Sequence, residues 1–145
     1  MHVKMGMAII SFGFKKISIA RDKPASGKVN VNHSARIDNV EEAKFSVGAG
    51  AKQDALRVAF TFTAEYAPEI ANINLQGELL WVDKPEQVKS SLDMWSKSKS
   101  LPTETLVPIY NTVLQRSIMQ SFLLTKEMNL PPPIRLPRLK PETPA

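Results

Sequence analysis

The stretch LRVAFTFTAEYAPEIANINLQGELLW, residues 56–81, decides the fold. Apolar and polar side chains alternate from Leu56 to Tyr66 and again from Ile73 to Trp81. Alternation with a period of two is typical of a β-strand that buries one face. A proline and a glutamate between the two halves form a turn signal. The sequence therefore predicts two long strands that pair antiparallel across a short turn.

A further strand is predicted upstream, over residues 12–21. Phe12 and Phe14 share one parity, whereas Ile17 and Ile19 share the other. The buried face must therefore switch near the two lysines between these pairs, as it does at a β-bulge. The DKPASGK segment that follows, residues 22–28, is predicted to be a loop because proline, serine and glycine interrupt regular structure.

The remaining strand is predicted over residues 29–37, where every second residue is apolar or histidine. This pattern indicates a half-buried strand, with His33 on its core face. The GAGAKQ segment at residues 48–53 is predicted to be a hairpin tip, and Gly77 is predicted to mark a bend in the last strand. Together these patterns predict a four-stranded antiparallel sheet.

A short helix is predicted to follow the sheet. Asp83 and Glu86 have the spacing of a capping box, in which each side chain satisfies a backbone N–H at the start of a helix. Pro85 fits the first turn, where its missing N–H costs nothing. The SKSKS segment at residues 96–100 is predicted to end this helix.

A long helix is predicted over about residues 103–128. Pro108 implies either a separate first turn or a regular helix that starts near Thr105. Asn129 is predicted to be a left-handed cap, and the three prolines that follow favour an extended segment. The helix has an apolar stripe wide enough to contact the sheet on one side and a second subunit or a large partner on the other. Its members are Leu106, Ile109, Tyr110, Val113, Leu114, Ile118, Phe122, Leu123 and Leu124.

The predicted architecture is therefore α+β, with both helices packed on one face of the sheet. The domain is expected to span residues 1–130, and residues 131–145 are expected to form an extended, proline-rich basic tail. A chain of 145 residues, 43% of them hydrophobic, suits one domain with a real core.

Composition excludes several chemistries. The chain has no cysteine, which excludes disulfides, thiol nucleophiles and cysteine-ligated zinc and fits a cytoplasmic location. No apolar run approaches the roughly 18–20 residues of a membrane span, so no membrane partner is expected. The apolar run at residues 5–14 leads directly into two lysines and a predicted strand, and we interpret it as part of the fold rather than a leader.

No catalytic constellation is visible in the sequence. His2 and His33 are the only histidines, so histidine pairs cannot build a metal cluster or a catalytic triad. The glycines at residues 48–50 lack the helix and the Lys-Ser/Thr ending of a phosphate-binding loop. We therefore expect no enzymatic activity, no cofactor and no metal.

Charge is distributed unevenly along the chain. The net charge is +5, and residues 1–36 contain seven Lys or Arg against one Asp, which gives +6 for this first quarter. Such asymmetry either serves solubility or indicates a polyanionic partner. Phosphate contacts would neutralise charge and orient the protein without reading a base sequence. The candidate RNA-binding residues are Lys15, Lys16, Arg21, Lys23, Lys28, Arg36, Arg135, Arg138 and Lys140.

The order of four strands, a short helix, a long helix and a proline-rich end resembles the fold of the bacterial export chaperone SecB. The resemblance is closer to small archaeal SecB-like proteins. It is carried by residues 56–81, by the helix around residues 114–127, and by NLPPPIRLPRLK at residues 129–140. It implies paired subunits and apolar grooves that are open to unfolded chains.

The chain departs from SecB in its charge and its ends. SecB is acidic and ends in a zinc-binding tail with cysteines, whereas this chain is basic and ends in KPETPA. These departures favour a ribosomal or ribosome-associated component that contacts rRNA and ribosomal proteins through its basic ends. The alternative is a SecB-like chaperone that holds unfolded or nascent polypeptide, and an antitoxin or regulator on the same fold is a third hypothesis. Under the chaperone alternative the candidate groove walls are Phe60, Phe62, Tyr66 and Trp81, although a core position is expected for each.

Overall fold

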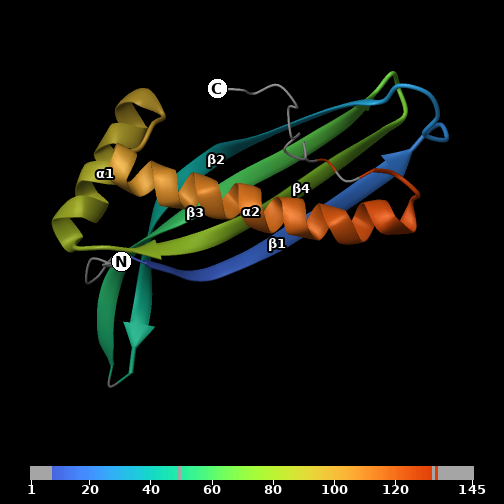
Figure 1. Cartoon of the computed structure of the whole chain (residues 1–145). Helices are drawn as coiled ribbons and strands as arrows, with labels where there is room; N and C mark the ends of the chain where they lie inside the picture. Colours follow the sequence, from blue (N-terminus) through green and yellow to red (C-terminus); the bar gives the residue numbers. More distant parts are fainter. Residues whose placement is uncertain (1–7, 49, 132, 134–145) are drawn as a thin grey trace, which may run out of the picture.

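The computed structural model describes residues 8–48, 50–131 and 133, and it consists of a sheet backed by two helices (Figure 1). The elements in chain order are β1 (Ala8–Arg21), β2 (Asn30–Val47), β3 (Ala51–Ala67), β4 (Ala71–Val82), α1 (Pro85–Ser98) and α2 (Thr103–Glu127). All strand pairs are antiparallel, in the order β1-β4-β3-β2. The predicted α+β fold with a four-stranded antiparallel sheet is confirmed.

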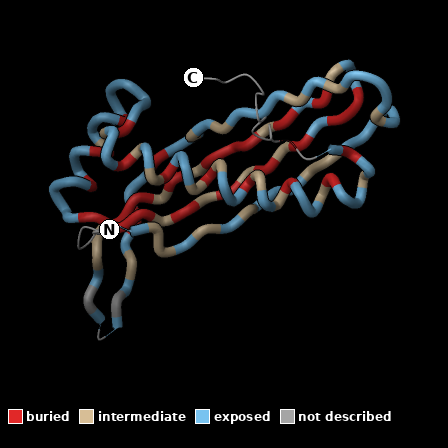
Figure 2. Tube along the Cα trace, in the orientation of Figure 1, coloured by how far each residue is buried: buried red, intermediate tan, exposed pale blue. Residues whose placement is uncertain are grey.

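The core lies between one face of the sheet and the two helices. The central strands β3 and β4 carry most of the buried residues (Figure 2), in the alternation that the sequence predicts. Val88 of α1 and Val113 of α2 belong to one buried cluster with Phe60 of β3 and Leu79 of β4. Both helices therefore pack on the same face, as predicted, and the opposite face of the sheet is mostly polar.

The predicted bulge in β1 is present. The register with β4 shifts between Phe14 and Lys16, which makes Lys15 the extra residue. The shift explains how phenylalanines of one parity and isoleucines of the other can face the same core.

β2 is longer than predicted because a bulge within it interrupts the alternation of apolar and polar residues. The register with β3 shifts between Ile37 and Asn39, so Asp38 is the extra residue. Asp38 accepts hydrogen bonds from Thr61 and, at 2.7 Å, from Arg36. Before the bulge the odd-numbered residues face the core, and after it the even-numbered residues do. The alternation that begins at residue 29 is therefore interrupted at the bulge, although the strand continues. The predicted hairpin tip accordingly narrows to the turn between Val47 and Ala51.

His33 lies on the core face of β2, as predicted, but the expectation that it is a core residue is wrong. This residue lies on the edge strand β2 and is exposed, with its ring stacked on that of Phe62 at a centroid distance of 5.9 Å. An edge strand has a neighbour on one side alone, so its inward-facing side chains remain partly open to solvent.

The predicted capping box at the start of α1 is also wrong. The cap residue is Lys84, and its side chain makes no capping hydrogen bond. Asp83 instead accepts hydrogen bonds from the Trp81 indole, at 3.3 Å, and from the Lys84 backbone, at 2.8 Å. The carboxylate thus joins the end of β4 to the start of the helix.

α2 is continuous from Thr103, with Pro108 inside it, so neither predicted interruption of its first turns occurs. At its other end Asn129 has a positive φ of 54°, as predicted. The Leu130 amide donates to the Thr125 carbonyl at 3.0 Å and the Asn129 amide to that of Lys126 at 3.5 Å, in the pattern of a Schellman motif. Leu130 is buried. Residues 134–145 of the predicted tail lie outside the described residues.

Gly77 is required by close packing in the sheet. A Cβ atom at this position would lie 2.2 Å from the Gly13 carbonyl oxygen and 2.7 Å from the Phe60 ring. The ring of Phe60 also stacks on Phe12, with centroids 5.0 Å apart. The glycine therefore makes room for the aromatic centre of the core.

Candidate functional site

The four aromatic residues proposed as groove walls lie in the core. Phe60, Phe62, Tyr66 and Trp81 are each at most 3% exposed. In this structure none of them presents its side chain to a partner, in agreement with the core position expected for each.

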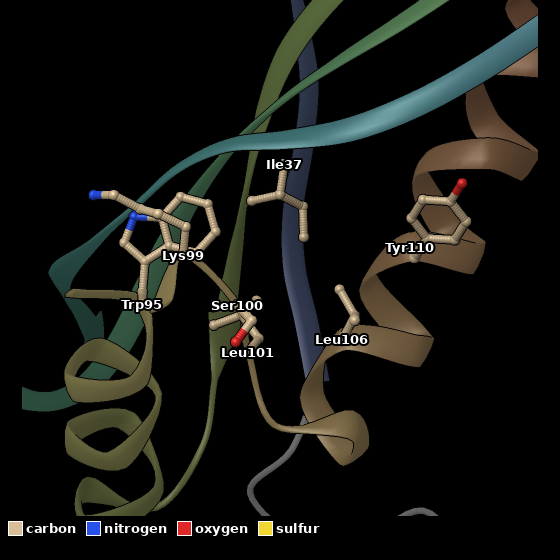
Figure 3. A pocket seen from close by; sticks show the side chains of 7 residues that line it. All are labelled: Ile37, Trp95, Lys99, Ser100, Leu101, Leu106 and Tyr110. Carbon is tan, nitrogen blue, oxygen red and sulfur yellow. The ribbon is translucent and has the colours of Figure 1, made fainter. Parts of the chain in front are cut away.

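An open apolar cleft lies elsewhere, where the end of α1, the connection to α2 and the first turns of α2 face β2. Its volume is about 240 Å³, below the roughly 300–1,000 Å³ of pockets that enclose drug-sized ligands. The space suits one or two large side chains rather than a folded partner. Figure 3 shows its lining residues, which are Ile37, Trp95, Lys99, Ser100, Leu101, Leu106 and Tyr110.

The local sequence explains why this cleft forms. α1 ends at Lys99, which adopts a left-handed conformation with φ of 54° and donates its backbone N–H to the Trp95 carbonyl at 2.9 Å. The chain then turns, Leu101 inserts into the core, and Pro102 caps the start of α2. This short connection holds the two helices apart at the edge of β2, and Tyr110 remains exposed beside the gap.

Trp95 forms one wall of the cleft and has an unusual polar environment. The residue is 7% exposed. Its indole nitrogen is buried and has no hydrogen-bond partner in the described part of the chain. The Lys99 ammonium lies 5.6 Å from the ring centroid, within the range of a cation–π contact. Figure 3 shows the lysine side chain extending across the indole.

A second apolar surface lies on α2. Met119, Phe122 and Leu123 are exposed within about one helical turn, and we call these three residues the outer patch. Leu123 is 63% exposed and Met119 is 59% exposed. The residues of α2 that contact the sheet are partly small and polar, among them Ser117 and Ser121. Ile118, named above as part of the apolar stripe, is half-buried.

A larger and more polar hollow of about 480 Å³ lies at the end of the sheet where β3 turns into β4. Three carboxylates and one ammonium group line it beside apolar surface, so it is less suited than the cleft to an apolar side chain of a client. Its lining residues are Asp22, Lys23, Glu65, Tyr66, Ala67, Glu69, Ala71 and Asn72.

Half of the described candidate RNA-binding residues are already paired with acidic residues. Ion pairs join Lys15 to Glu78 at 3.7 Å, Lys23 to Glu69 at 3.8 Å and Arg36 to Asp38 at 2.7 Å. Each such carboxylate offsets the attraction of its partner for phosphate.

The other candidate basic residues do not form one patch. Lys16, Arg21 and Lys28 make no ion pair with any described residue. Lys16 and Arg36 lie in the same cross-strand row, separated by Gln76 and Thr61, on the face without helices. These two residues therefore lie on the opposite edge strands of the sheet, while Arg21 ends β1 and Lys28 lies in the loop after it. Arg135, Arg138 and Lys140 lie outside the described residues.

The described residues contain no group of three or more His, Cys, Asp or Glu side chains that could hold a metal ion. Within the same residues no helix is both long and apolar enough to cross a membrane.

Comparisons with known proteins bear on the fold. No protein-family model and no curated protein matches the chain. Among solved structures, it is similar to the Mycobacterium tuberculosis SecB-like chaperone Rv1957, which was determined in complex with a ChAD peptide from the HigA1 antitoxin Rv1956. The TM-score is 0.51 and the sequence identity 12%, and the match covers 93% of this chain and 91% of that one. The predicted SecB-like fold is thereby confirmed, and the narrower resemblance to archaeal members stays a prediction.

Proposed function

We propose that this protein is a non-catalytic chaperone that binds extended segments of unfolded or nascent polypeptide in the cytoplasm. The observation that carries the proposal is the open apolar cleft between α1, α2 and β2, walled by Trp95 and Tyr110. The similar solved structure supports it, because that SecB-like chaperone was captured with a peptide from an antitoxin.

The cleft has the physical properties that transient client binding needs. Burying an aromatic side chain of about 150–250 Å² contributes at most roughly 4–6 kcal/mol. Ordering a flexible chain opposes much of that gain. One cleft therefore binds weakly and releases readily, and affinity rises when several sites engage one client.

Self-association would supply those several sites. The outer patch places three large apolar side chains on the exposed side of α2, and contiguous exposed apolar residues mark interaction surfaces. We therefore expect copies of this chain to assemble through α2, so that one client meets more than one cleft.

A light-scattering assay tests the chaperone proposal. A severalfold excess of the protein should suppress aggregation of a chemically unfolded client. Tyr110→Glu, which puts a charge into the cleft, should weaken the suppression. Asn111→Glu is the matched control, because it adds the same charge to an exposed neighbour on α2. Aggregation that proceeds unchanged with the wild-type protein would refute the proposal.

The ribosomal hypothesis is a second candidate. It is supported by Lys16, Arg21 and Lys28, which make no ion pair with a described residue, and by the basic tail sequence. It predicts co-migration with a ribosomal subunit on sucrose gradients at low salt, lost at high salt as phosphate contacts weaken. Removal of residues 134–145 should also weaken this co-migration. A protein that stays at the top of the gradient in both salts is not a ribosomal component.

A further inference from the structure

Among the described residues that line the cleft, Lys99 is the one that carries a charge. Its backbone is fixed because it caps the end of α1 in a left-handed conformation and donates its N–H to Trp95. The side chain therefore starts from a defined point on the rim, and its ammonium lies over the indole of Trp95. The described part of the lining contains no carboxylate that could neutralise it.

Two acidic residues near the cleft in sequence have other partners. Asp93 pairs with Lys97 one turn apart, at 3.2 Å. Asp38, next to Ile37 of the cleft wall, is bound to Arg36 and Thr61 on the opposite face of the sheet. Neither of these carboxylates is paired with the ammonium at the rim.

Trp95 adds a second unsatisfied group. Its indole N–H is buried without a hydrogen-bond partner among the described residues, and buried donors of this kind normally have one. Figure 3 shows the Trp95 nitrogen and the Lys99 ammonium at the same end of the indole, turned away from Ile37. An acceptor that drew the flexible lysine side chain off the ring would reach both donors.

We propose that the cleft selects client segments in which a large apolar side chain is followed or preceded by Asp or Glu, and that Lys99 determines this specificity. The inference rests on the proposed chaperone function. The apolar side chain occupies the space between Ile37, Leu106 and Tyr110. The neighbouring carboxylate accepts hydrogen bonds from the Lys99 ammonium and, once the lysine side chain has moved aside, from the Trp95 indole.

Short unstructured peptides with one shared apolar core test the selection with the full-length protein. The flanking residues are Asp and Glu in one peptide, Asn and Gln in the second, and Lys in the third. Fluorescence anisotropy should show the acidic peptide binding about fivefold more tightly than the neutral one, the upper range for an exposed ion pair. The Lys-flanked peptide should bind least.

The preference should disappear in Lys99→Gln and persist in Lys89→Gln, which removes an exposed charge from the same helix without releasing Asp93 from its ion pair with Lys97. In ¹H–¹⁵N spectra the acidic peptide should shift the Trp95 indole resonance. The Trp81 indole, which is hydrogen-bonded to Asp83, serves as an internal reference.

Equal affinities for the acidic and neutral peptides would overturn the selection while leaving the cleft as a binding site. Equal losses in Lys99→Gln and Lys89→Gln would also overturn it, because the effect would then be a general one of net charge. If none of the peptides binds, the chaperone proposal fails together with this inference.

Discussion

The hydroxyl of Tyr66, near the end of β3, donates a hydrogen bond to the backbone carbonyl of Pro131, which follows α2. These residues are 65 positions apart in the sequence. The contact fastens the start of the proline-rich segment to the core, next to the buried Leu130. It therefore links the end of β3 to the segment that follows α2.

Tyr66→Phe should lower the free energy of unfolding by about 0.5–1.5 kcal/mol. The substitution preserves the ring but removes the hydrogen bond to the carbonyl of the exposed Pro131, and the net contribution of such a bond is of that order. Urea denaturation measures the change. An unaltered denaturation midpoint would mean that the hydrogen bond contributes nothing to stability.

The same residue predicts a loss of stability in alkali. Burial raises the pKa of Tyr66 to about 12, from an ordinary value of 10.0. Between these two values the unfolded chain loses the tyrosine proton while the folded protein keeps it. The free energy of unfolding should therefore fall as pH rises above 10, by up to about 1.4 kcal/mol per pH unit.

The contribution of Tyr66 to this decline is isolated by comparison with Tyr66→Phe. Other groups titrate in alkali in both proteins, so the informative quantity is the difference between the two pH profiles measured by urea denaturation. The free energy of unfolding of the wild-type protein should fall relative to that of Tyr66→Phe from pH 10 to pH 12. Parallel profiles over this range would contradict the prediction.

Gly77→Ala should destabilise the fold by about 1–3 kcal/mol, the usual cost of forcing extra volume into a packed core. The added methyl group would overlap the Gly13 carbonyl and the Phe60 ring. Gly13→Ala is the matched control on the neighbouring strand, because a Cβ there meets no atom within 4 Å. Thermal unfolding should give a clearly lower melting temperature for Gly77→Ala than for Gly13→Ala. Similar melting temperatures would refute the packing argument.

Leu123→Glu should disrupt self-association while leaving the monomer folded, because the Leu123 side chain is mostly exposed. Ile118→Glu, at a half-buried position, should act in the same direction with some loss of stability. Gln115→Glu on the exposed side of the same helix is the control. Sedimentation measures the outcome, and a wild-type protein that stays monomeric at high concentration would exclude assembly through α2.

The sequence predicts those elements in which one face is uniformly buried. Strands β3 and β4 follow from their alternation because both are central, and the bulge at Lys15 follows from a change of parity. The second half of β2 is not predicted, because the extra residue Asp38 changes which alternate residues face the core. No pair of apolar residues on each side of Asp38 marks this change in the sequence. Asp83 has the spacing of a cap, but its carboxylate is bound to the Trp81 indole, and sequence spacing does not show this tertiary contact.

The cleft could not be predicted from sequence because its walls come from three separate elements. Ile37, Leu106 and Tyr110 each fit the apolar periodicity of their own element. Taken separately, each is predicted to be a core residue. Whether they pack together or leave a gap depends on how the connection after Lys99 spaces α1 from α2. The sequence gives one indication of an exposed apolar site. Tyr110 belongs to an apolar stripe that is wider than the sheet can cover.

Clients are expected to bind in the cleft between α1, α2 and β2, and site-directed photocrosslinking tests this binding site. A photoreactive benzoylphenylalanine replaces Tyr110 and, in a control protein, the adjacent Asn111. An unfolded client should crosslink strongly from position 110 and weakly from position 111, and the same client should crosslink from neither position when it is folded. Equal crosslinking from both positions, or none from position 110, would show that clients do not bind in the cleft.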